Sequence, residues 1–275
     1  MVMVDKFKER DWAKRTALTM LILFCACIVI LLAADLSYLT SKDISLGKAY
    51  EIIVSFDILA ALKLSLKTSF ISLILITATA VPMGFALSRC HFRGKSIVNV
   101  IVDVPLVLPP VVTGLSLLAF FGSPSGSVVK ELLERLGLPL ISAFGIVLCQ
   151  YLIAVPYSIR SAKASFDSVD TKLEDVARTL GASPLQVFYK ITLPLARNGL
   201  VAGAVMSWAR AIGVFGPLMV FIGTGPRVQV MPTKMWLELS IGNIEASLVI
   251  ALVTVFIACS ALLIVHKLVP SRNWS

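Results

Sequence analysis

Long runs of apolar residues without charge divide this chain into segments. Five charge-free runs cover residues 16–34, 68–88, 104–129, 136–159 and 246–266, and a sixth apolar stretch, 198–222, is interrupted only by Arg210. Each run exceeds the roughly 18 apolar residues that a helix needs to cross about 30 Å of hydrocarbon. Strands of a β-barrel would instead alternate over about ten residues. The pattern predicts an all-α, multi-pass membrane protein with about six spans, at 16–36, 68–88, 104–122, 138–159, 198–222 and 246–266.

The composition supports a membrane protein. Of the 275 residues, 57% are hydrophobic and 15% are charged, whereas a soluble domain carries roughly 25% charged residues. The five cysteines lie in or beside apolar runs and none has the C-x-x-C spacing, so neither a zinc site nor a redox pair is indicated. We therefore expect no metal site.

The positive charges are distributed unevenly between the two sides of the membrane. The net charge is +9, and sixteen Lys and Arg residues fall on the side of the N-terminus against eight on the other side. The positive-inside rule then places both termini in the cytoplasm. This gives a cytoplasmic N-terminal segment 1–15, a transmembrane domain 16–266 with a cytoplasmic loop 160–197, and a cytoplasmic tail 267–275. Because topology explains the basic excess, we expect no nucleic-acid partner.

Two spans contain residues that break helices. Pro109 and Pro110 interrupt the third span and precede Thr113 and Gly114, while Gly213, Phe215 and Gly216 follow Arg210 in the fifth. Proline removes a backbone donor and kinks or unwinds a helix. Irregular backbone at membrane depth is tolerated where it packs in protein or lines a water-filled cavity. The breaks are therefore candidates for lining a transport pathway, with plain packing kinks as the alternative.

The loop 160–197 has the pattern of a helix, a turn and a second helix. Asp170 or Thr171 can cap the first helix, Gly181 suits a left-handed residue after its end, and Ser183 can cap a second helix with Pro184 at its first position. We expect the loop to be folded.

The second helix of the loop is predicted to be short and amphipathic. Leu185, Phe188 and Ile191 recur at helical spacing, and Pro194 ends the segment. We expect Leu185 and Phe188 to be buried in a partner protein; the alternative is that Phe188 packs onto the spans of its own chain.

This loop resembles the EAA loop of ABC-importer permeases, in which E-A-A is followed by three residues, Gly, nine residues and I-x-L-P. Asp175, Val176 and Ala177 stand at the E-A-A positions, and Gly181 and the segment 191–194 match in register. The resemblance implies that the loop docks in a cleft of a separate ATPase subunit, which binds ATP and Mg; this chain would hold no cofactor and would not be an enzyme. The implied coupling residues are Glu174, Asp175, Ala177, Arg178, Gly181, Ala182, Ser183, Pro184, Leu185, Phe188, Ile191 and Pro194.

Other stretches are similar to the molybdate/tungstate and sulfate permeases of type I ABC importers. They are residues 103–114, 177–182 and 208–216, and the likeness extends from about 60 to 265, although Val214 stands where family members usually have Glu. The resemblance implies a homodimer in the lipid membrane that binds two ATPase subunits, receives molybdate or tungstate from an external binding protein, and alternates between outward- and inward-facing states. A sulfate/thiosulfate permease is the alternative. The candidate pathway residues are Pro109, Pro110, Thr113, Gly114, Ser207, Arg210, Gly213, Phe215 and Gly216.

Arg210 is a charge near the middle of the fifth span. It lies twelve residues beyond Asn198, or about 18 Å at 1.5 Å per residue. A charged side chain there costs at least about 2.5–3.5 kcal/mol on insertion scales. Three compensations remain open: the aqueous pathway and its anion, a structural bond to helix-end carbonyls or Asp103, and snorkelling.

Three other functions fit the sequence less well. The loop also resembles a DNA-binding helix-turn-helix, but it is tethered between two spans and carries little net charge. Gly94, Lys95 and Ser96 imitate the end of a P-loop, but Arg89 occupies the position of its first Gly. A self-contained secondary transporter usually shows repeats and several ionisable residues within its spans, and neither is found here.

Overall fold

The computed structural model describes residues 2–41 and 46–268, and within those ranges every regular element is a helix. The chain forms two compact units, 1–53 and 54–275. In the first, α1 (Val2–Ser41) joins the predicted N-terminal segment and the first predicted span in one continuous helix, and α2 (Leu46–Val54) follows it. Most of the predicted tail 267–275 lies outside the described residues.

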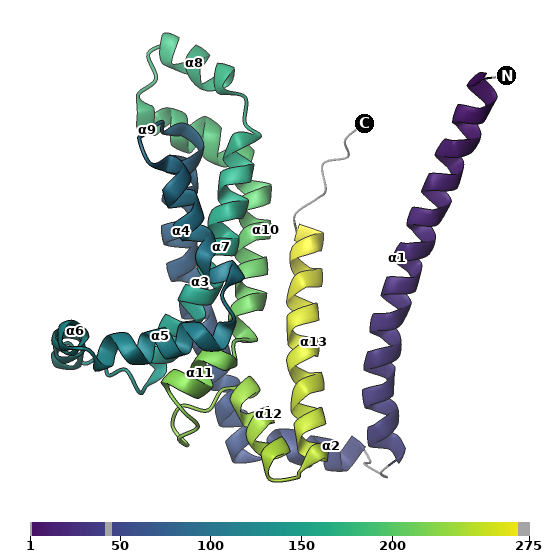
Figure 1. Cartoon of the computed structure of the whole chain (residues 1–275), viewed down its shortest axis with the longest axis vertical. Helices are drawn as coiled ribbons and strands as arrows, with labels where there is room; N and C mark the ends of the chain where they lie inside the picture. The colour runs from purple at the N-terminus through teal and green to yellow at the C-terminus, as the bar shows by residue number, and fades with distance from the viewer. Residues whose placement is uncertain (1, 42–45, 269–275) are drawn as a thin grey trace. The chain divides into compact units, whose positions relative to one another are not determined.

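The second unit contains the remaining helices (Figure 1). Its helical loop, residues 168–192, lies at one end of the bundle, and α11 and α12 lie towards the other end. The helices are α3 (Phe56–Arg89), α4 (Lys95–Val107), α5 (Pro110–Gly122), α6 (Pro124–Arg135), α7 (Ala143–Asp167), α8 (Thr171–Thr179), α9 (Pro184–Val187), a π-helical turn (Phe188–Thr192), α10 (Leu193–Ile212), α11 (Gly216–Phe221), α12 (Met231–Ser240) and α13 (Ile244–Leu268).

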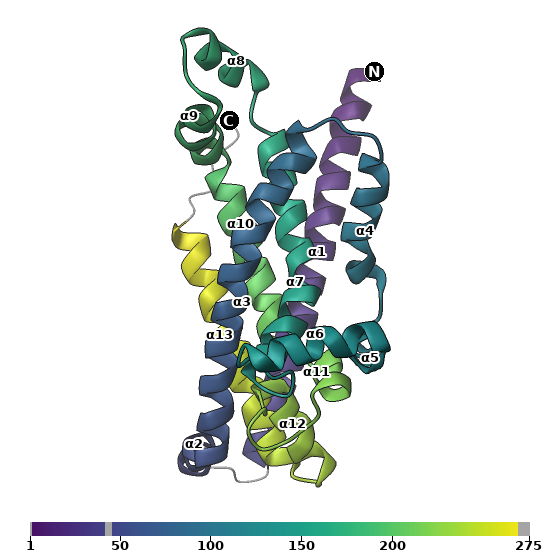
Figure 2. The ribbon, with the colours of Figure 1, turned by 90° about the vertical axis from the view of Figure 1, so that its left-hand side faces the viewer.

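The core of this unit is formed by α3, α7 and α10, which run side by side in both views (Figures 1 and 2). Small residues allow their backbones to approach closely. A Cβ atom added at Gly84 of α3 would lie 2.5 Å from the Cβ of Ala162 of α7, and one added at Gly203 of α10 would lie 2.4 Å from the Cβ of Ser161. Close packing of this kind replaces the hydrophobic effect as the force that joins helices in lipid.

Buried hydroxyl groups on α3 add polar contacts between the same helices. Ser72 Oγ donates to Gln150 Oε1 of α7 at 2.9 Å, and Trp208 Nε1 of α10 donates to Ser69 Oγ at 3.2 Å. Interhelical hydrogen bonds of this type contribute about 0.6 kcal/mol on average in a membrane. Close glycine contacts and buried hydrogen bonds therefore join α3, α7 and α10.

The third predicted span, 104–122, is two helices rather than one. The helix α4 ends at Val107 and α5 begins at Pro110, and their axes are bent by 109°. Pro109 is the N-cap residue and Pro110 the first residue of α5, so the two missing N–H groups fall where α4 can no longer continue. The predicted interruption at this pair is confirmed. As a result α5 and α6 project from the side of the bundle (Figures 1 and 2).

The fifth predicted span, 198–222, is also divided. The helix α10 ends at Ile212, and α11 begins at Gly216 after a non-helical break. Beyond α11, the backbone N–H of Met231, at the start of α12, donates to Ser65 Oγ of α3 at 2.7 Å. The break after Ile212 therefore lies between α10 and α12, which both contact α3.

Fewer helices qualify as spans by length and composition than the sequence pattern predicts. In the described residues, four helices are long and apolar enough to cross a membrane, or five when α4 and α5 count as one bent span. The twenty residues of α10 are long enough, but Arg197, Asn198 and Arg210 lower their mean hydropathy. The all-α, multi-pass architecture is confirmed, and the number six is approximate.

Candidate functional site

The helical loop is held in shape by the caps of its two helices. Asp170 caps α8, since its Oδ1 accepts a hydrogen bond of 3.0 Å from the backbone N–H of Lys172. Ser183 and Gln186 form a reciprocal capping box at the start of α9, with Pro184 at the first helical position. Asp170 is thus the cap among the two candidates in the sequence, and the cap predicted at Ser183 is confirmed.

Gly181 ends the first helix of the loop. Its φ of 87° is left-handed, as predicted. Its N–H donates to the carbonyl of Arg178 at 2.9 Å, and the N–H of Ala182 donates to the carbonyl of Ala177 at 3.0 Å, which is the hydrogen-bond pattern of a Schellman motif. Apart from its two chain neighbours, no described residue has an atom within 4 Å of a Cβ built at Gly181. The requirement for glycine here is therefore conformational and not steric.

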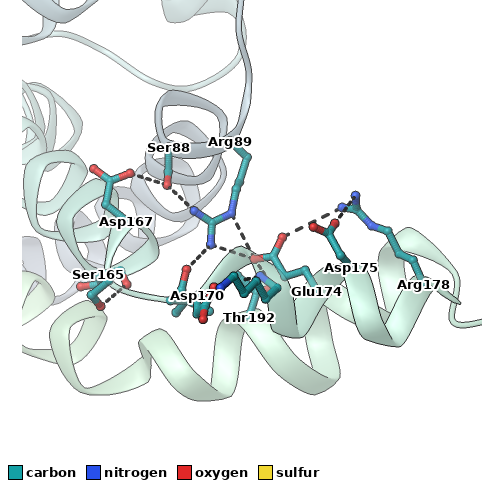
Figure 3. A network of polar contacts seen from close by, with 12 residues as sticks. Ser88, Arg89, Ser165, Asp167, Asp170, Glu174, Asp175, Arg178 and Thr192 are labelled. Carbon is teal, nitrogen blue, oxygen red and sulfur yellow. Dashed lines mark hydrogen bonds and ion pairs between the residues drawn. The ribbon is translucent and has the colours of Figure 1, made fainter. Parts of the chain in front are cut away.

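Glu174 of α8 is the centre of a polar network between the helical loop and the bundle (Figure 3). Its Oε1 accepts hydrogen bonds from Arg89 Nε at 3.1 Å, from Arg89 Nη2 at 2.8 Å and from Thr192 Oγ1 at 3.0 Å. Arg89 Nη2 also donates to the carbonyl of Val169 at 2.9 Å. The carboxylate therefore connects the end of α3 to the residue that precedes α10.

The network continues from Arg89 along the ends of α3 and α7. Arg89 Nη1 donates to Ser88 Oγ at 3.1 Å, and Ser88 Oγ donates to Asp167 Oδ1 at 2.6 Å. Lys163 Nζ lies 2.6 Å from Asp167 Oδ2. Three helices thus meet through alternating charged and polar groups at this end of the bundle.

The two adjacent acids of α8 have opposite environments. The side chain of Glu174 is only 4% exposed, whereas that of Asp175 is 70% exposed. Arg178 lies within 4.0 Å of Glu174 and 3.9 Å of Asp175. The acid at the E-A-A position is therefore the one available to a partner, and the predicted coupling residue Glu174 faces its own chain.

The helical loop also exposes a row of large apolar side chains. We call Leu173, Val176, Leu180, Leu185 and Tyr189 the apolar loop face; all five are exposed, Leu180 to 83%. Of these five residues, only Leu185 was predicted from the sequence to face a partner. The sequence did contain a signal for three of the others. Leu173, Val176 and Leu180 recur at helical spacing and so form one apolar face of α8 and the residue after it, and no other predicted helix of the loop could cover that face.

The expectation that Phe188 belongs to the partner-facing surface is wrong. Its ring centroid lies 4.9 Å from that of Phe85 of α3, and Phe85 packs edge-on against Phe166 of α7. The π-helical turn that begins at Phe188 aims this ring towards the bundle, and Val187 is buried beside it. Of the other predicted coupling residues, Ala177, Ala182 and Ile191 are half-buried, while Arg178, Gly181, Ser183, Pro184 and Pro194 are exposed.

The two helix breaks, which are far apart in sequence, border one cavity of about 270 Å³. Pro110 contributes from the start of α5, and Arg210 from the last turn of α10. Backbone and side chains of the second break complete the wall. The remaining lining residues are Val111, Ile153, Gly213, Val214, Phe215, Gly216 and Pro217.

Close backbone contact between α5 and α11 shapes this cavity. Gly114 of α5 lies against Pro217, and a Cβ added at Gly216 would lie 2.9 Å from Cγ2 of Val111. Phe215 packs on Trp236 of α12 with ring centroids 5.5 Å apart. The glycines at both breaks are therefore needed for the approach of the two short helices.

Four predicted pathway residues do not line the cavity: Pro109, Thr113, Gly114 and Ser207. The hydroxyls of Thr113 and Ser207 are buried, and in the described part of the chain neither has a hydrogen-bond partner. Pro109 is exposed at the bend before α5. The structure thus brings together only part of the predicted set: Pro110, Arg210, Gly213, Phe215 and Gly216 line the cavity.

Arg210 is exposed and forms no hydrogen bond or ion pair with any residue in the ranges 2–41 and 46–268. The carboxylate of Asp103, one of its candidate partners, is bound by the guanidinium of Arg160 instead. Val214, in the position of the family's usual Glu, is buried in an apolar cluster with Ile146 and Ile153. The alternative of a bond to Asp103 is excluded, and the positive charge of Arg210 remains available beside the cavity.

No cluster of three or more His, Cys, Asp or Glu side chains that could hold a metal ion occurs among the residues that the structure describes.

Comparison with known proteins gives one family. Residues 80–274 match the family described as "Binding-protein-dependent transport system inner membrane component". A Haloferax volcanii protein named a probable molybdenum ABC transporter permease is 39% identical over 212 residues, covering 77% of this chain and 76% of that protein. The molybdate/tungstate transport system permease protein WtpB of Thermococcus kodakarensis is 34% identical over 216 residues, covering 78% and 81%. The molybdenum transport system permease protein ModB of Haemophilus influenzae is 37% identical over 180 residues, covering 65% and 78%.

Solved structures show the same fold. A bacterial alginate ABC transporter, crystallised with its alginate-bound periplasmic protein, superposes with a TM-score of 0.74 at 19% identity over 94% of both chains. The MetNI methionine ABC transporter, in an inward-facing form, superposes with a TM-score of 0.63 at 18% identity, covering 76% of this chain and 93% of that one.

Proposed function

The chain belongs to the family of inner membrane components of binding-protein-dependent transport systems, and on that premise we propose that it is the permease subunit of an ABC importer for molybdate or tungstate. The observation that carries the substrate class is the guanidinium of Arg210, which pairs with no described residue and lies beside the cavity between the two helix breaks. A guanidinium offers several N–H donors in a fixed plane and suits an oxyanion. The names of the relatives at 34–39% identity favour molybdate and tungstate within that class.

The helical loop supports an ATPase subunit as the partner. Five large apolar side chains of the apolar loop face are exposed, and an apolar patch of this kind marks an interaction site. Asp175 and Arg178 add charges at its edge. In this proposal the ATPase subunits bind ATP and Mg and hydrolyse the nucleotide, and the permease is not itself an enzyme.

The topology follows from the distribution of basic residues. With both termini in the cytoplasm, the number of crossings is even, and six are obtained when α4 with α5 and α10 with α11 each count as one broken crossing. The helical loop then faces the cytoplasm, where the ATPase is located. The cell membrane is the site of action.

A second copy of the chain is the proposed partner within the membrane. The helices α4 and α5 expose large apolar side chains, including Val107, Val111 and Leu115, beside a cavity that holds the charge of Arg210. Lipid can cover the apolar residues, but an unpaired charge at this depth requires water or protein. A homodimer with the cavity at its axis covers the apolar side chains of α4 and α5 and surrounds the charge of Arg210 with protein and water. An external binding protein delivers the anion to this cavity.

Transport then proceeds by alternating access. ATP binding and hydrolysis favour one arrangement of the helices over the other, and the anion passes Arg210 when the break between α10 and α11 changes its exposure. Sulfate and thiosulfate have the same charge and a similar shape, so a sulfate/thiosulfate permease is the second candidate. A secondary carrier is the third.

Uptake into proteoliposomes tests these functions. The permease is reconstituted with its ATPase and binding protein, and internal molybdenum, tungsten and sulfur are measured by mass spectrometry with ATP inside. We expect ATP-dependent accumulation of molybdate and tungstate that a hundredfold excess of sulfate does not abolish. Uptake of sulfate alone identifies the second candidate, and uptake by the permease alone on an ion gradient identifies the third.

A further inference from the structure

The attachment of α8 to the bundle is polar and not apolar. Its large apolar residues Leu173 and Val176 point into solvent, so packing does not hold α8 against α3. The pair of Glu174 and Arg89 does, because Oε1 of this buried carboxylate receives three hydrogen bonds from two different segments. Hydrogen bonds to a charged group are about twice as strong as neutral ones.

The same carboxylate reaches α10. Thr192, which donates to Glu174 Oε1 at 3.0 Å, directly precedes Leu193, the first residue of α10. At its other end α10 stops at Ile212, next to the break that borders the cavity. The helices α3, α7 and α10 pack closely through glycine and serine contacts, and interiors packed in this way transmit strain.

We propose that Glu174, with Arg89, is the positioning residue through which a movement of the helical loop is transmitted to α3 and α10 and then to the helix break. This inference rests on the proposed function, in which the ATPase moves the loop. The two neighbouring acids, Glu174 and Asp175, then have different roles. In this proposal Asp175, which is exposed, is presented to the ATPase. Glu174 holds the loop to the end of α3 through Arg89 and to Thr192 before α10 (Figure 3).

A merely structural role for Glu174 makes a different prediction. If the pair served only to fold the loop, its loss would deform the apolar loop face and release the ATPase. If it transmits movement, its loss leaves the ATPase bound but uncouples it from the break. Retention of the ATPase and the response of the break must therefore be measured in the same sample.

The test uses the complete transporter in a chain whose native cysteines are replaced by serine. A single cysteine is placed at Gly213, which lines the cavity and where an added Cβ makes ordinary contacts, the nearest at 3.7 Å. Its labelling by a charged thiol reagent is compared with and without ATP and vanadate. Glu174→Gln is the test variant, and Asp175→Asn is the matched control, since it neutralises the adjacent acid.

We expect Glu174→Gln to retain the ATPase, to lose the nucleotide-dependent difference in labelling, and to lower transport about tenfold, within the range of coupling changes known for such contacts. Asp175→Asn should weaken ATPase retention while the transporters that remain assembled keep the difference. If Glu174→Gln retains both the ATPase and the difference, the inference is overturned. Release of the ATPase by Glu174→Gln also overturns it, in favour of the structural role.

Arg89→Lys provides a second variant if Glu174→Gln does not insert. The ammonium keeps the charge but cannot donate to Glu174 from two positions and to the carbonyl of Val169 in the same way. Arg89→Lys should reduce the nucleotide-dependent difference in labelling less than Glu174→Gln does. An unchanged difference in labelling contradicts the inference. Failure of the proposed function is distinct, because the parent transporter would then show no nucleotide-dependent labelling at all.

Discussion

Gly114 of α5 lies directly against Pro217 of α11: a Cβ atom at Gly114 would be 2.7 Å from the Cα of Pro217 and 2.8 Å from its carbonyl oxygen. Both neighbours are backbone atoms, so no side-chain rotation can make room. Residues from the two helix breaks, separated by about a hundred positions in the sequence, are held together here. This contact fixes the wall of the cavity beside Arg210.

Gly114→Ala should therefore separate α5 from α11. Overpacking of this kind destabilises a protein by about 1–3 kcal/mol, and transport should fall with it. Gly122→Ala is the matched control, because it lies on the same helix and a Cβ there meets no atom of another described segment within 4 Å. Thermal unfolding of the two purified variants in one detergent compares them. Equal melting temperatures would show that the contact between α5 and α11 is not tight.

Replacing Gly181 should uncouple the ATPase without removing the permease from the membrane. A left-handed backbone costs a side chain about 1–2 kcal/mol, and a β-branched residue suffers most. Gly181→Val should abolish transport-coupled ATP hydrolysis, whereas Gly181→Asn, which tolerates this conformation, should retain most of it. Hydrolysis stimulated by the binding protein is measured for both. Full stimulation in Gly181→Val would contradict the role of the turn.

Arg210→Gln should reduce oxyanion transport while the protein folds normally. Since Arg210 is exposed and pairs with no described residue, its loss leaves no buried charge unpaired, and stability should change by less than about 0.5 kcal/mol. A hydrogen bond to a charged group contributes about 1.5–3 kcal/mol, so kcat/KM for molybdate should fall by about ten- to a hundredfold. The kcat/KM of Arg210→Lys for molybdate should lie between those of the parent transporter and of Arg210→Gln. Loss of insertion or assembly in Arg210→Gln would identify a structural residue instead.

Leu180→Ser should weaken the binding of the ATPase. Leu180 is the most exposed residue of the apolar loop face, and burying a leucine side chain against a partner contributes about 1.5–3 kcal/mol. The apparent Kd for the ATPase, measured by titration in detergent, should rise at least about tenfold. Leu136→Ser, an exposed leucine after α6, is the control. Equal affinities in the two variants would show that the apolar loop face does not contact the ATPase.

Local features of the loop could be predicted from the sequence because the chemistry is local. Gly181 and Ser183 satisfy backbone groups within a few residues of themselves, and the turn forms for that reason whatever surrounds it. The break at Pro109 and Pro110 follows in the same way from missing N–H groups. Its angle of 109° could not be predicted, because it depends on the contact of α5 with α11.

Contacts between segments that are distant in the sequence could not be predicted. Phe188 has the spacing of an amphipathic helix, but the π-helical turn and the position of Phe85 decide which way its ring points. The role of Arg89 in binding Glu174 required the end of α3 and the start of α8 to be neighbours. Asp103 likewise pairs with Arg160 rather than with Arg210, because α4 packs on α7.

We expect the substrate to pass between the two helix breaks. Labelling of Gly213→Cys by a charged thiol reagent tests it, with Phe256→Cys on α13, an exposed apolar position, as the lipid-facing control. Gly213→Cys should react at least about tenfold faster in one nucleotide state than in the other, and molybdate should slow the reaction. Phe256→Cys should not react in either state. Equal or absent labelling of Gly213→Cys in both states of a transporter that still takes up molybdate would contradict it.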